Sequence, residues 1–389
     1  MSGVATPAFD TEFRLVLACS RLPADEVSVR YLACQVENWE KVLKYAEWHE
    51  LTPLICHALI DSGCPLSSSM SENLVRKVRK NAQKNLLLTA ELLRIMRALV
   101  AGNIRAIPYK GPVQAESTYG NLAMRGFCDL DILVAGEDVQ RTLSVMHELG
   151  YRGEYSFTPT QETKYLRSAC EYNFLHESNQ VRVEIHWQVV PAQLGLTIEF
   201  NRLWSRTKFL PIGSSRLRVL SPEDAVLVLS LHGFKHLWSC LKWVCDIATL
   251  PSSSDDLDWS YVLDEADRIG AVRVVLVALF LANQMYQSPL PDPIRLRLRR
   301  DPVAVSIARE IVSSYAPGAS VSRLKAWLLM LRAHSGLRLR VTYVARTLLD
   351  PATEEVVCTP QRSMVVMRTQ RVFHVARQAI SDFYKSQRN

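Results

Sequence analysis

Two aspartates stand one residue apart, Asp129 and Asp131, inside an otherwise apolar run. Side chains alternate between the two faces of a strand, so both carboxylates lie on one face and Leu130 and Ile132 on the other. Adjacent carboxylates repel each other and are costly to remove from water. A divalent cation removes that conflict, and oxygen ligands suit Mg²⁺ or Mn²⁺. The spacing therefore predicts half of a metal site.

A third carboxylate is expected on a neighbouring strand. In residues 181–187, Arg182, Glu184 and His186 share one face of a predicted strand. Residues 171–176 are its predicted hairpin partner, with the turn at 177–180. Glu184 would complete a set of three carboxylates around two metal ions. His186 is either a base or orienting residue of this site or a hydrogen-bonded structural histidine, and the sequence leaves both open.

A turn that could hold phosphate precedes these carboxylates. Lys110, Gly111 and Pro112 follow a predicted short strand at 104–109 and precede a predicted helix. Glycine allows close approach of the backbone, proline suits a first helical position, and the N–H groups of a helix N-terminus bind phosphate. With Arg125, which can grip phosphate oxygens through two N–H groups, the turn predicts a triphosphate clamp.

These residues require a small sheet to position them. The predicted order is strand, helix, strand, helix, strand, strand, a small mixed α/β sheet closed by a hairpin near residues 210–220. Helices are predicted on both sides of it along the chain. The predicted fold is α+β, a small mixed β-sheet core flanked by helical regions: an N-terminal helical region at 1–102, the core at 103–220 and a C-terminal helical domain at 221–389.

Residues 232–246, predicted as helical, are rich in histidine, lysine and tryptophan. At helical spacing His232, Lys235 and Lys242 could share a face that contacts a nucleotide. An amphipathic helix with aromatic core residues is the commoner explanation. His232 and His236 are four residues apart, but no HExxH pattern accompanies them and no zinc site is predicted.

Composition sets the broad class. The chain has 389 residues, 48% hydrophobic and 22% charged, as expected for a soluble globular protein. A net charge of +7 suits an anionic substrate but is too weak to indicate nucleic acid. The nine cysteines are scattered, which indicates a reducing compartment. No apolar stretch approaches the roughly 20 residues of a membrane span. A cytoplasmic protein with no membrane partner is expected, and the basic segment 338–389 is read as a solvated helix face.

The motifs together resemble a known family. They are Tyr109-Lys110-Gly111, Tyr119-Gly120, Arg125, the run DLDILV from Asp129, EIHW from Glu184, and HGFKHLWSCLKWVCDIATL from His232. In this order they resemble the uncharacterised nucleotidyltransferase family of the DNA-polymerase-β-like superfamily. The resemblance implies catalysis and metal binding by Asp129, Asp131 and Glu184. It also implies that the triphosphate is bound by Lys110, Gly111 and Arg125. The cleft would be lined from the C-terminal side by Lys235, His236 and Lys242.

Two departures from the superfamily pattern stand in this chain. Pro112 follows Gly111 where the superfamily has Gly-Ser, so the serine contact to phosphate is missing. Glu184 stands where aspartate is more usual, and its longer arm shifts the bound metal or the base by about one methylene.

The function expected from this resemblance is Mg²⁺-dependent transfer of NMP from an NTP, with ATP as the expected donor. The acceptor is a hydroxyl, phosphate or amine on a small molecule, peptide or tRNA. Members of the family often accompany gene clusters for peptide natural products such as lasso peptides. Alternatives are phosphoryl transfer at the same site, toxin-like modification of tRNA, and a non-catalytic scaffold.

Overall fold

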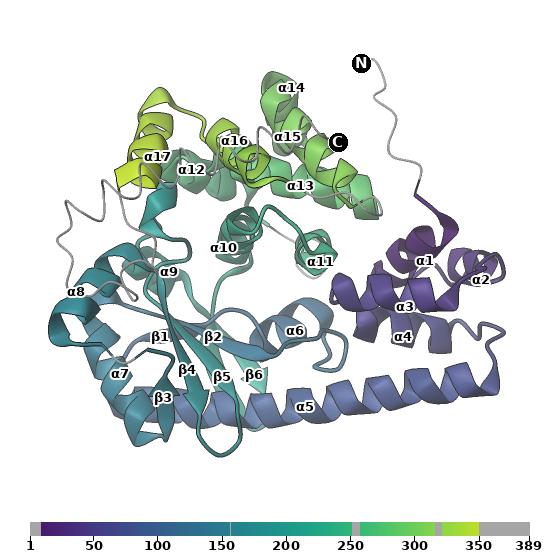
Figure 1. Ribbon diagram of the computed structural model, residues 1–389, viewed down its shortest axis with the longest axis horizontal. Helices are drawn as coiled ribbons and strands as arrows, with labels where there is room; N and C mark the ends of the chain where they lie inside the picture. Colours follow the sequence, from purple (N-terminus) through teal and green to yellow (C-terminus); the bar gives the residue numbers. More distant parts are fainter. Residues whose placement is uncertain (1–8, 156, 251–256, 316–320, 350–389) are drawn as a thin grey trace.

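The computed structural model describes residues 9–155, 157–250, 257–315 and 321–349. A five-stranded mixed sheet lies between a long N-terminal helix and a layer of C-terminal helices (Figure 1). Its strand order is β1-β2-β5-β4-β3. The strands are β1 (Ala106–Pro108), β2 (Asp129–Val134), β3 (Tyr151–Gly153), β4 (Glu171–His176) and β5 (Arg182–His186). The α+β fold predicted from the sequence is confirmed.

The pairing of β2 with β5 decides how the carboxylates meet. This pair is parallel, whereas β1 with β2, β4 with β5 and β3 with β4 are antiparallel. The register sets Asp131 directly opposite Glu184 and Asp129 opposite Arg182. Residues opposite each other in a ladder project to the same face. The expected placement of Glu184 on the strand beside the two aspartates is therefore confirmed.

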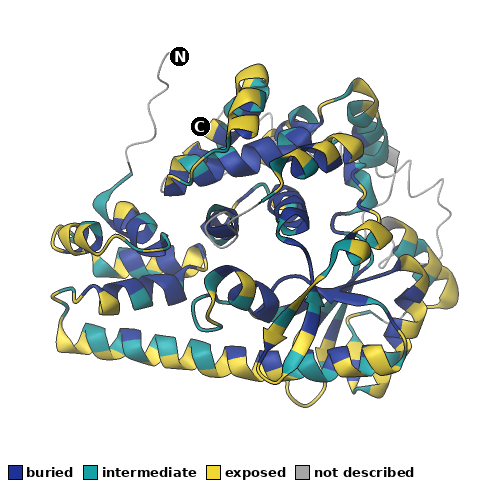
Figure 2. Ribbon diagram, turned by 180° about the vertical axis from the view of Figure 1, so that it is seen from behind, coloured by how far each residue is buried: buried dark blue, intermediate teal, exposed yellow. Residues whose placement is uncertain are grey.

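The helix α5 (Ser68–Ala101) runs along one side of the sheet (Figure 1). Its 34 residues contain no glycine or proline, and the Ser67 side chain caps it by accepting the Met70 N–H. Its cap lies four residues before Ser71, which the sequence predicts as the N-cap of a long helix that ends at Ala101. The second half buries Leu92, Ile95 and Leu99 in the core that also holds the apolar side of β2 and β5, while its outer side is exposed (Figure 2).

The remaining helices of the N-terminal region are α1 (Thr11–Ser20), α2 (Glu26–Ala33), α3 (Trp39–Trp48) and α4 (Thr52–Asp61). Their apolar residues join those of the C-terminal helices in one cluster, which includes Phe13, Phe234 and Trp238. Both helical regions thus pack against each other as well as against the sheet. The division of the chain at residues 102 and 220 stays a prediction.

The C-terminal layer is built around α13 (Val272–Tyr286), which is apolar on nearly every side and is packed by α10, α11 and α15. No helix among the described residues has the length and apolar character to cross a membrane. Of the basic segment 338–389, the part beyond residue 349 lies outside the described residues, and so do residues 251–256, which the sequence predicts to be a loop. The other helices are α10 (Pro222–Lys235), α11 (Leu241–Thr249), α12 (Trp259–Ile269), α14 (Asp292–Arg300), α15 (Pro302–Ser313), α16 (Arg323–Ala333) and α17 (Leu337–Leu349).

The prediction of one continuous helix through residues 232–246 is wrong. Helix α10 ends at Lys235, and Leu237 and Trp238 have positive φ values of 49° and 55°. The Trp238 N–H donates to the Gly233 carbonyl, and its ring folds back over Gly233, where a Cβ would lie 2.5 Å from it. Burying this ring completely is the physical reason for the break. His232, Lys235 and Lys242 therefore do not share one helix face.

Besides α9 (Phe200–Arg206), two helices were not predicted. The first, α8 (Pro159–Ser168), follows β3, so the core contains one more strand and one more helix than the expected order. A capping box between Thr158 and Gln161 begins it. The second, α14, begins within residues 289–293, a proline-rich stretch for which the sequence predicts only a helix breaker. Proline is tolerated in the first turn of a helix, where its missing N–H costs nothing.

The hairpin predicted near residues 210–220 is present as β6 (Lys208–Ile212) and β7 (Ser215–Val219), a separate two-stranded sheet. The remaining helices of the core are α6 (Pro112–Tyr119), α7 (Val139–Glu148) and α9 (Phe200–Arg206). Contacts of β7 with β1 close the β1 edge of the main sheet.

Candidate active site

Lys110 and Asp131 form a buried ion pair at the start of the site. Lys110 follows β1, and the Tyr109 N–H donates to the Asp131 carbonyl at 3.3 Å, which fixes the chain there. The Lys110 ammonium donates to Asp131 Oδ1, and their side chains are 8% and 3% exposed. Burying either charge alone would be costly, so each stabilises the ionised form of the other.

His186 links three carboxylates. Its Nε2 lies 3.3 Å from Asp131 Oδ1 and 3.2 Å from Glu184 Oε2, and its Nδ1 lies 3.3 Å from Glu171 Oε2. Burial by itself would lower the pKa of His186, but the hydrogen bonds to Asp131 and its other partners raise it well above its usual value. The imidazolium form therefore completes a row of alternating charges across the strands.

The pKa values of Asp129 and Asp131 are shifted in opposite directions by their surroundings. Burial opposes ionisation of Asp131, yet Lys110 and His186 hold its pKa well below the usual range. At Asp129, burial and then the charges of Asp131 and Glu184 raise the pKa to about 6. Negative charge at Asp129 is thus not compensated by the neighbouring side chains. That excess is what a bound divalent cation would relieve.

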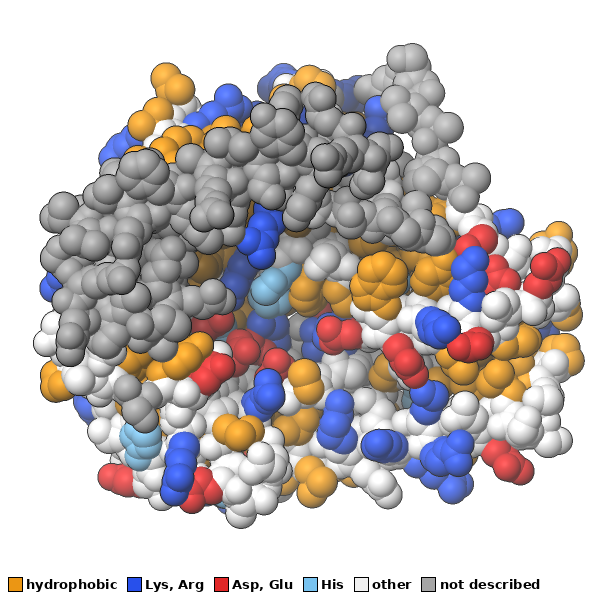
Figure 3. All heavy atoms as spheres, viewed as in Figure 1, with side chains coloured by type: hydrophobic (Ala, Val, Ile, Leu, Met, Phe, Trp, Pro, Cys, Tyr) orange, Lys and Arg blue, Asp and Glu red, His pale blue; other side chains and the backbone are white. Residues whose placement is uncertain are grey.

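The donor atoms present fit Mg²⁺. Asp129, Asp131 and Glu184 supply carboxylate oxygens on one sheet face, the ligand type that hard divalent cations prefer. One ligand atom each of Asp131, Glu184 and His186 lies within 4.8 Å of the others. In the space-filling view acidic side chains gather near the middle of one face, with lysine, arginine and histidine side chains beside them (Figure 3).

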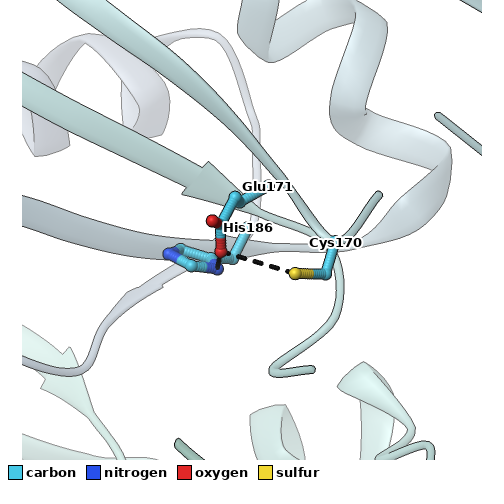
Figure 4. A group of neighbouring side chains, drawn as sticks. All are labelled: Cys170, Glu171 and His186. Carbon is cyan, nitrogen blue, oxygen red and sulfur yellow. Dashed lines mark hydrogen bonds and ion pairs between the residues drawn. The ribbon is translucent and has the colours of Figure 1, made fainter. Parts of the chain in front are cut away.

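A second group of possible metal ligands lies beside the first. The Glu171 carboxylate lies between the His186 ring and the Cys170 thiol, which donates to Glu171 Oε2 at 3.4 Å (Figure 4). Lys235 Nζ already lies 2.8 Å from the same oxygen. Burial opposes ionisation of Glu171, but His186 and Lys235 lower its pKa to about 2. Lysine supplies the positive charge here, so the arrangement gives no reason to assign a metal ion to it.

Gly111 connects β1 to α6 with a backbone conformation that residues other than glycine rarely adopt. Its φ and ψ are 57° and −128°, and a Cβ would lie 3.3 Å from the Asp129 carbonyl oxygen. The turn therefore packs directly on the backbone of the strand that carries the aspartates. This contact brings the N-terminus of α6 next to Asp129, as the sequence predicts for Gly111 and Lys110.

We expect Gly111→Ala to lower the free energy of unfolding by about 2 kcal/mol, because the residue must keep a positive φ and displace the Asp129 carbonyl. Chemical denaturation measures this change. Gly120→Ala is the matched control, because Gly120 also has positive φ but its Cβ would meet nothing within 4 Å. Equal losses in the two variants would contradict the close approach at Gly111.

Arg125 is paired with Asp246 and makes no hydrogen bond to any of the three carboxylates within the described residues. Its guanidinium makes two hydrogen bonds of 2.9 Å to Asp246 on α11, and the Tyr119 hydroxyl donates to the same carboxylate at 2.7 Å. Both charged side chains are almost fully buried. The structure thus engages Arg125 with the C-terminal helices, and its expected role at the triphosphate stays a prediction.

The three cleft residues expected from the C-terminal side occupy different places. Lys235 reaches the site through Glu171. Lys242 pairs with Glu50 of the N-terminal region and its charge acts on Asp129. His236 is exposed, and its ring stacks on Trp243 with centroids 4.9 Å apart. Its ligand-binding role also stays a prediction.

Sequence reasoning missed two acidic partners, Glu171 and Asp246. Glu171 could have been found from the alternation in β4, where Glu171, Asn173 and Leu175 must share a face once the hairpin with β5 is assumed. Asp246 carried no such signal, because only the packing of α11 against the Tyr119–Arg125 region places it there.

Comparison with known proteins agrees with the family expected from the motifs. Residues 35–287 match the family described as "Uncharacterised nucleotidyltransferase", and the chain belongs to this family. No curated protein matches the chain. Among solved structures, the lincosamide antibiotic adenylyltransferase LnuA in its lincomycin-bound form is similar at 17% identity and a TM-score of 0.30. That match covers 42% of this chain and 97% of LnuA.

Proposed function

We propose that this protein is a Mg²⁺-dependent nucleotidyltransferase that moves NMP from an NTP, with ATP as the expected donor, to a hydroxyl, phosphate or amine acceptor. The observation that carries this proposal is the register of β2 and β5, which sets Asp131 beside Glu184 with Asp129 on the same face. The family of the chain supports it. The three carboxylates as metal ligands and the Gly111 turn as a phosphate-binding turn are the groups that this chemistry needs.

Asp129, Asp131 and Glu184 would hold the metal ions. When bound, the ions would neutralise the phosphate oxygens and orient the reacting groups. The ion pair with Lys110 keeps Asp131 ionised and positioned. Lys110 also places a positive charge at the N-terminus of α6, where the phosphates would bind.

The donor would enter from the side of α6. The segment from Gly126 to Cys128, directly before Asp129, lines a cavity of about 240 Å³ together with residues of α3, α4 and α5. Lys77 and Lys84 are among its basic residues. Arg125 would act as a positioning residue, since its bonds to Asp246 and its carbonyl bond to Asn85 hold this segment in place.

In the transfer step the acceptor oxygen or nitrogen attacks the α-phosphorus, the bond from that phosphorus to the bridging oxygen breaks, and pyrophosphate leaves. The Glu184 carboxylate, 29% exposed and held by His186 Nε2, would take the proton of the acceptor. Lys110 is the nearest side-chain cation to Asp131 and would oppose the charge that develops on the leaving phosphates.

The test is the position of the transferred label. Incubation with NTP labelled at the α-phosphate should label the product, and γ-labelled NTP should release labelled pyrophosphate. Transfer of the γ-label to a product would instead show the phosphotransferase alternative. Release of neither label across candidate acceptors, together with no NTP binding, would favour the scaffold alternative. Identifying the acceptor also decides between peptide natural-product biosynthesis and tRNA modification.

A further inference from the structure

Two rows of side chains cross the catalytic face of the sheet. One row runs from Asp131 through Glu184 to Asn173, because these residues are opposite one another on β2, β5 and β4. The other runs from Asp129 through Arg182 and Leu175 to Arg152 on β3. The candidate metal site and the outer half of the sheet therefore share one continuous surface.

A hollow of about 560 Å³ lies over the outer half of these rows. Its lining includes Arg152, Asn173, Leu175, Arg182 and Glu184. Small-molecule sites typically have volumes of about 300–1,000 Å³. The hollow and the Gly111 turn lie on opposite sides of β2, since β1 flanks that strand on one side and β5 on the other. A molecule in the hollow would meet Glu184 from the side away from the expected phosphates.

Each charged side chain that lines the hollow has a side-chain partner among the described residues, with one exception. Arg152 pairs with Glu177, and Glu154 accepts a hydrogen bond of 2.8 Å from Asn173. Arg182 is exposed, and its guanidinium makes no hydrogen bond or ion pair within the described part of the chain. Asn173 Oδ1 is shielded from solvent and likewise has no hydrogen-bond partner among the described residues. An unpaired guanidinium and an unpaired amide oxygen are groups that a polar ligand would satisfy.

We propose that this hollow is the acceptor site and that it takes an acceptor bearing an anionic carboxylate or phosphate group, bound by Arg182. The proposal rests on the nucleotidyl transfer proposed above. With its anionic group on Arg182, the acceptor would have its nucleophilic hydroxyl or amine over Glu184, which lies two residues further along β5 on the same face. Asn173 Oδ1 would accept a hydrogen bond from a donor group of the same molecule.

Ligand-observed NMR with three small alcohols tests the binding without requiring turnover. Glycerol 3-phosphate and glycerate carry the anion, and glycerol lacks it. We expect both anions to bind the wild type, glycerol to bind at least about tenfold more weakly, and Arg182→Gln to weaken both anions by at least about tenfold. Whichever of the two anions binds more tightly shows whether phosphate or carboxylate is the preferred group. Arg216→Gln, which removes an arginine from β7 outside the hollow, should change nothing.

Equal binding of glycerol, binding of neither anion, or unchanged binding to Arg182→Gln would overturn the proposal. A parallel measurement of Mg²⁺-dependent NTP binding separates this failure from failure of the proposed function. Arg182→Gln should leave NTP binding intact. Absence of NTP binding in the wild type would contradict nucleotidyl transfer itself, whereas intact NTP binding without an anion effect would contradict only the acceptor site.

Discussion

Asp246→Asn is expected to lower the free energy of unfolding by about 3–5 kcal/mol, one of the largest single effects in the molecule. The change leaves the Arg125 guanidinium buried without its counter-charge, and uncompensated buried charges carry a penalty of this size. The Tyr119 hydroxyl would also lose its carboxylate acceptor. Urea denaturation of the full chain measures the change.

Glu310→Gln provides the matched control for this result. It breaks the Arg332–Glu310 pair, whose side chains are 37% and 33% exposed. Partly exposed pairs contribute about 0–1 kcal/mol because water screens them. A loss at Asp246 no larger than the loss at Glu310 would contradict the idea that the Arg125–Asp246 pair ties the core to the C-terminal helices.

Asp129→Asn is expected to separate stability from function. The ionised carboxylate is destabilising without metal, since burial and the charges of Asp131 and Glu184 raise its pKa to about 6. Removing the charge should raise the free energy of unfolding by roughly 2 kcal/mol at pH 8 in the presence of a chelator. The same change should lower nucleotidyl transfer on the order of 1,000-fold, because charge stabilisation at the reacting centre is lost.

The two readouts of Asp129→Asn are denaturation in chelator and release of pyrophosphate. Leu130→Val, at the neighbouring buried position on the apolar face of β2, is the control that should lower stability without a comparable loss of transfer. A variant Asp129→Asn that is less stable than the wild type and fully active would show that this carboxylate is an ordinary structural residue.

The sequence was sufficient to predict the strands that carry the candidate site, because their signals are local. Alternation of apolar and polar residues in β2 and β5 sets which side chains share a face, and the hairpin of β4 with β5 follows from the short turn between them. That Glu184 shares a face with His186 followed from these patterns, whereas its expected place on the strand beside Asp131 came from the family resemblance. The long helix α5 was also predictable, apart from its first turn.

What the sequence did not reveal depends on packing between distant segments. The break after Lys235 arises because the Trp238 ring buries itself against Gly233, and helical periodicity contains no sign of this. The partner of Arg125 lies 121 residues away on α11. Local patterns place a charged residue on a face, but they do not say which opposing charge the fold brings to it.

Mg²⁺-dependent binding of a nucleotide at Asp129 is the most direct test of the proposed function. Thermal unfolding would be followed with each of the four NTPs, with and without Mg²⁺, for the wild type and for Asp129→Asn, which leaves the Lys110–Asp131 pair intact. We expect at least one NTP to raise the melting temperature only with Mg²⁺ and only in the wild type, since ligand at 100 times its Kd stabilises by about 2.7 kcal/mol. No rise with any NTP, or an equal rise in Asp129→Asn, would contradict a nucleotide site built on these carboxylates.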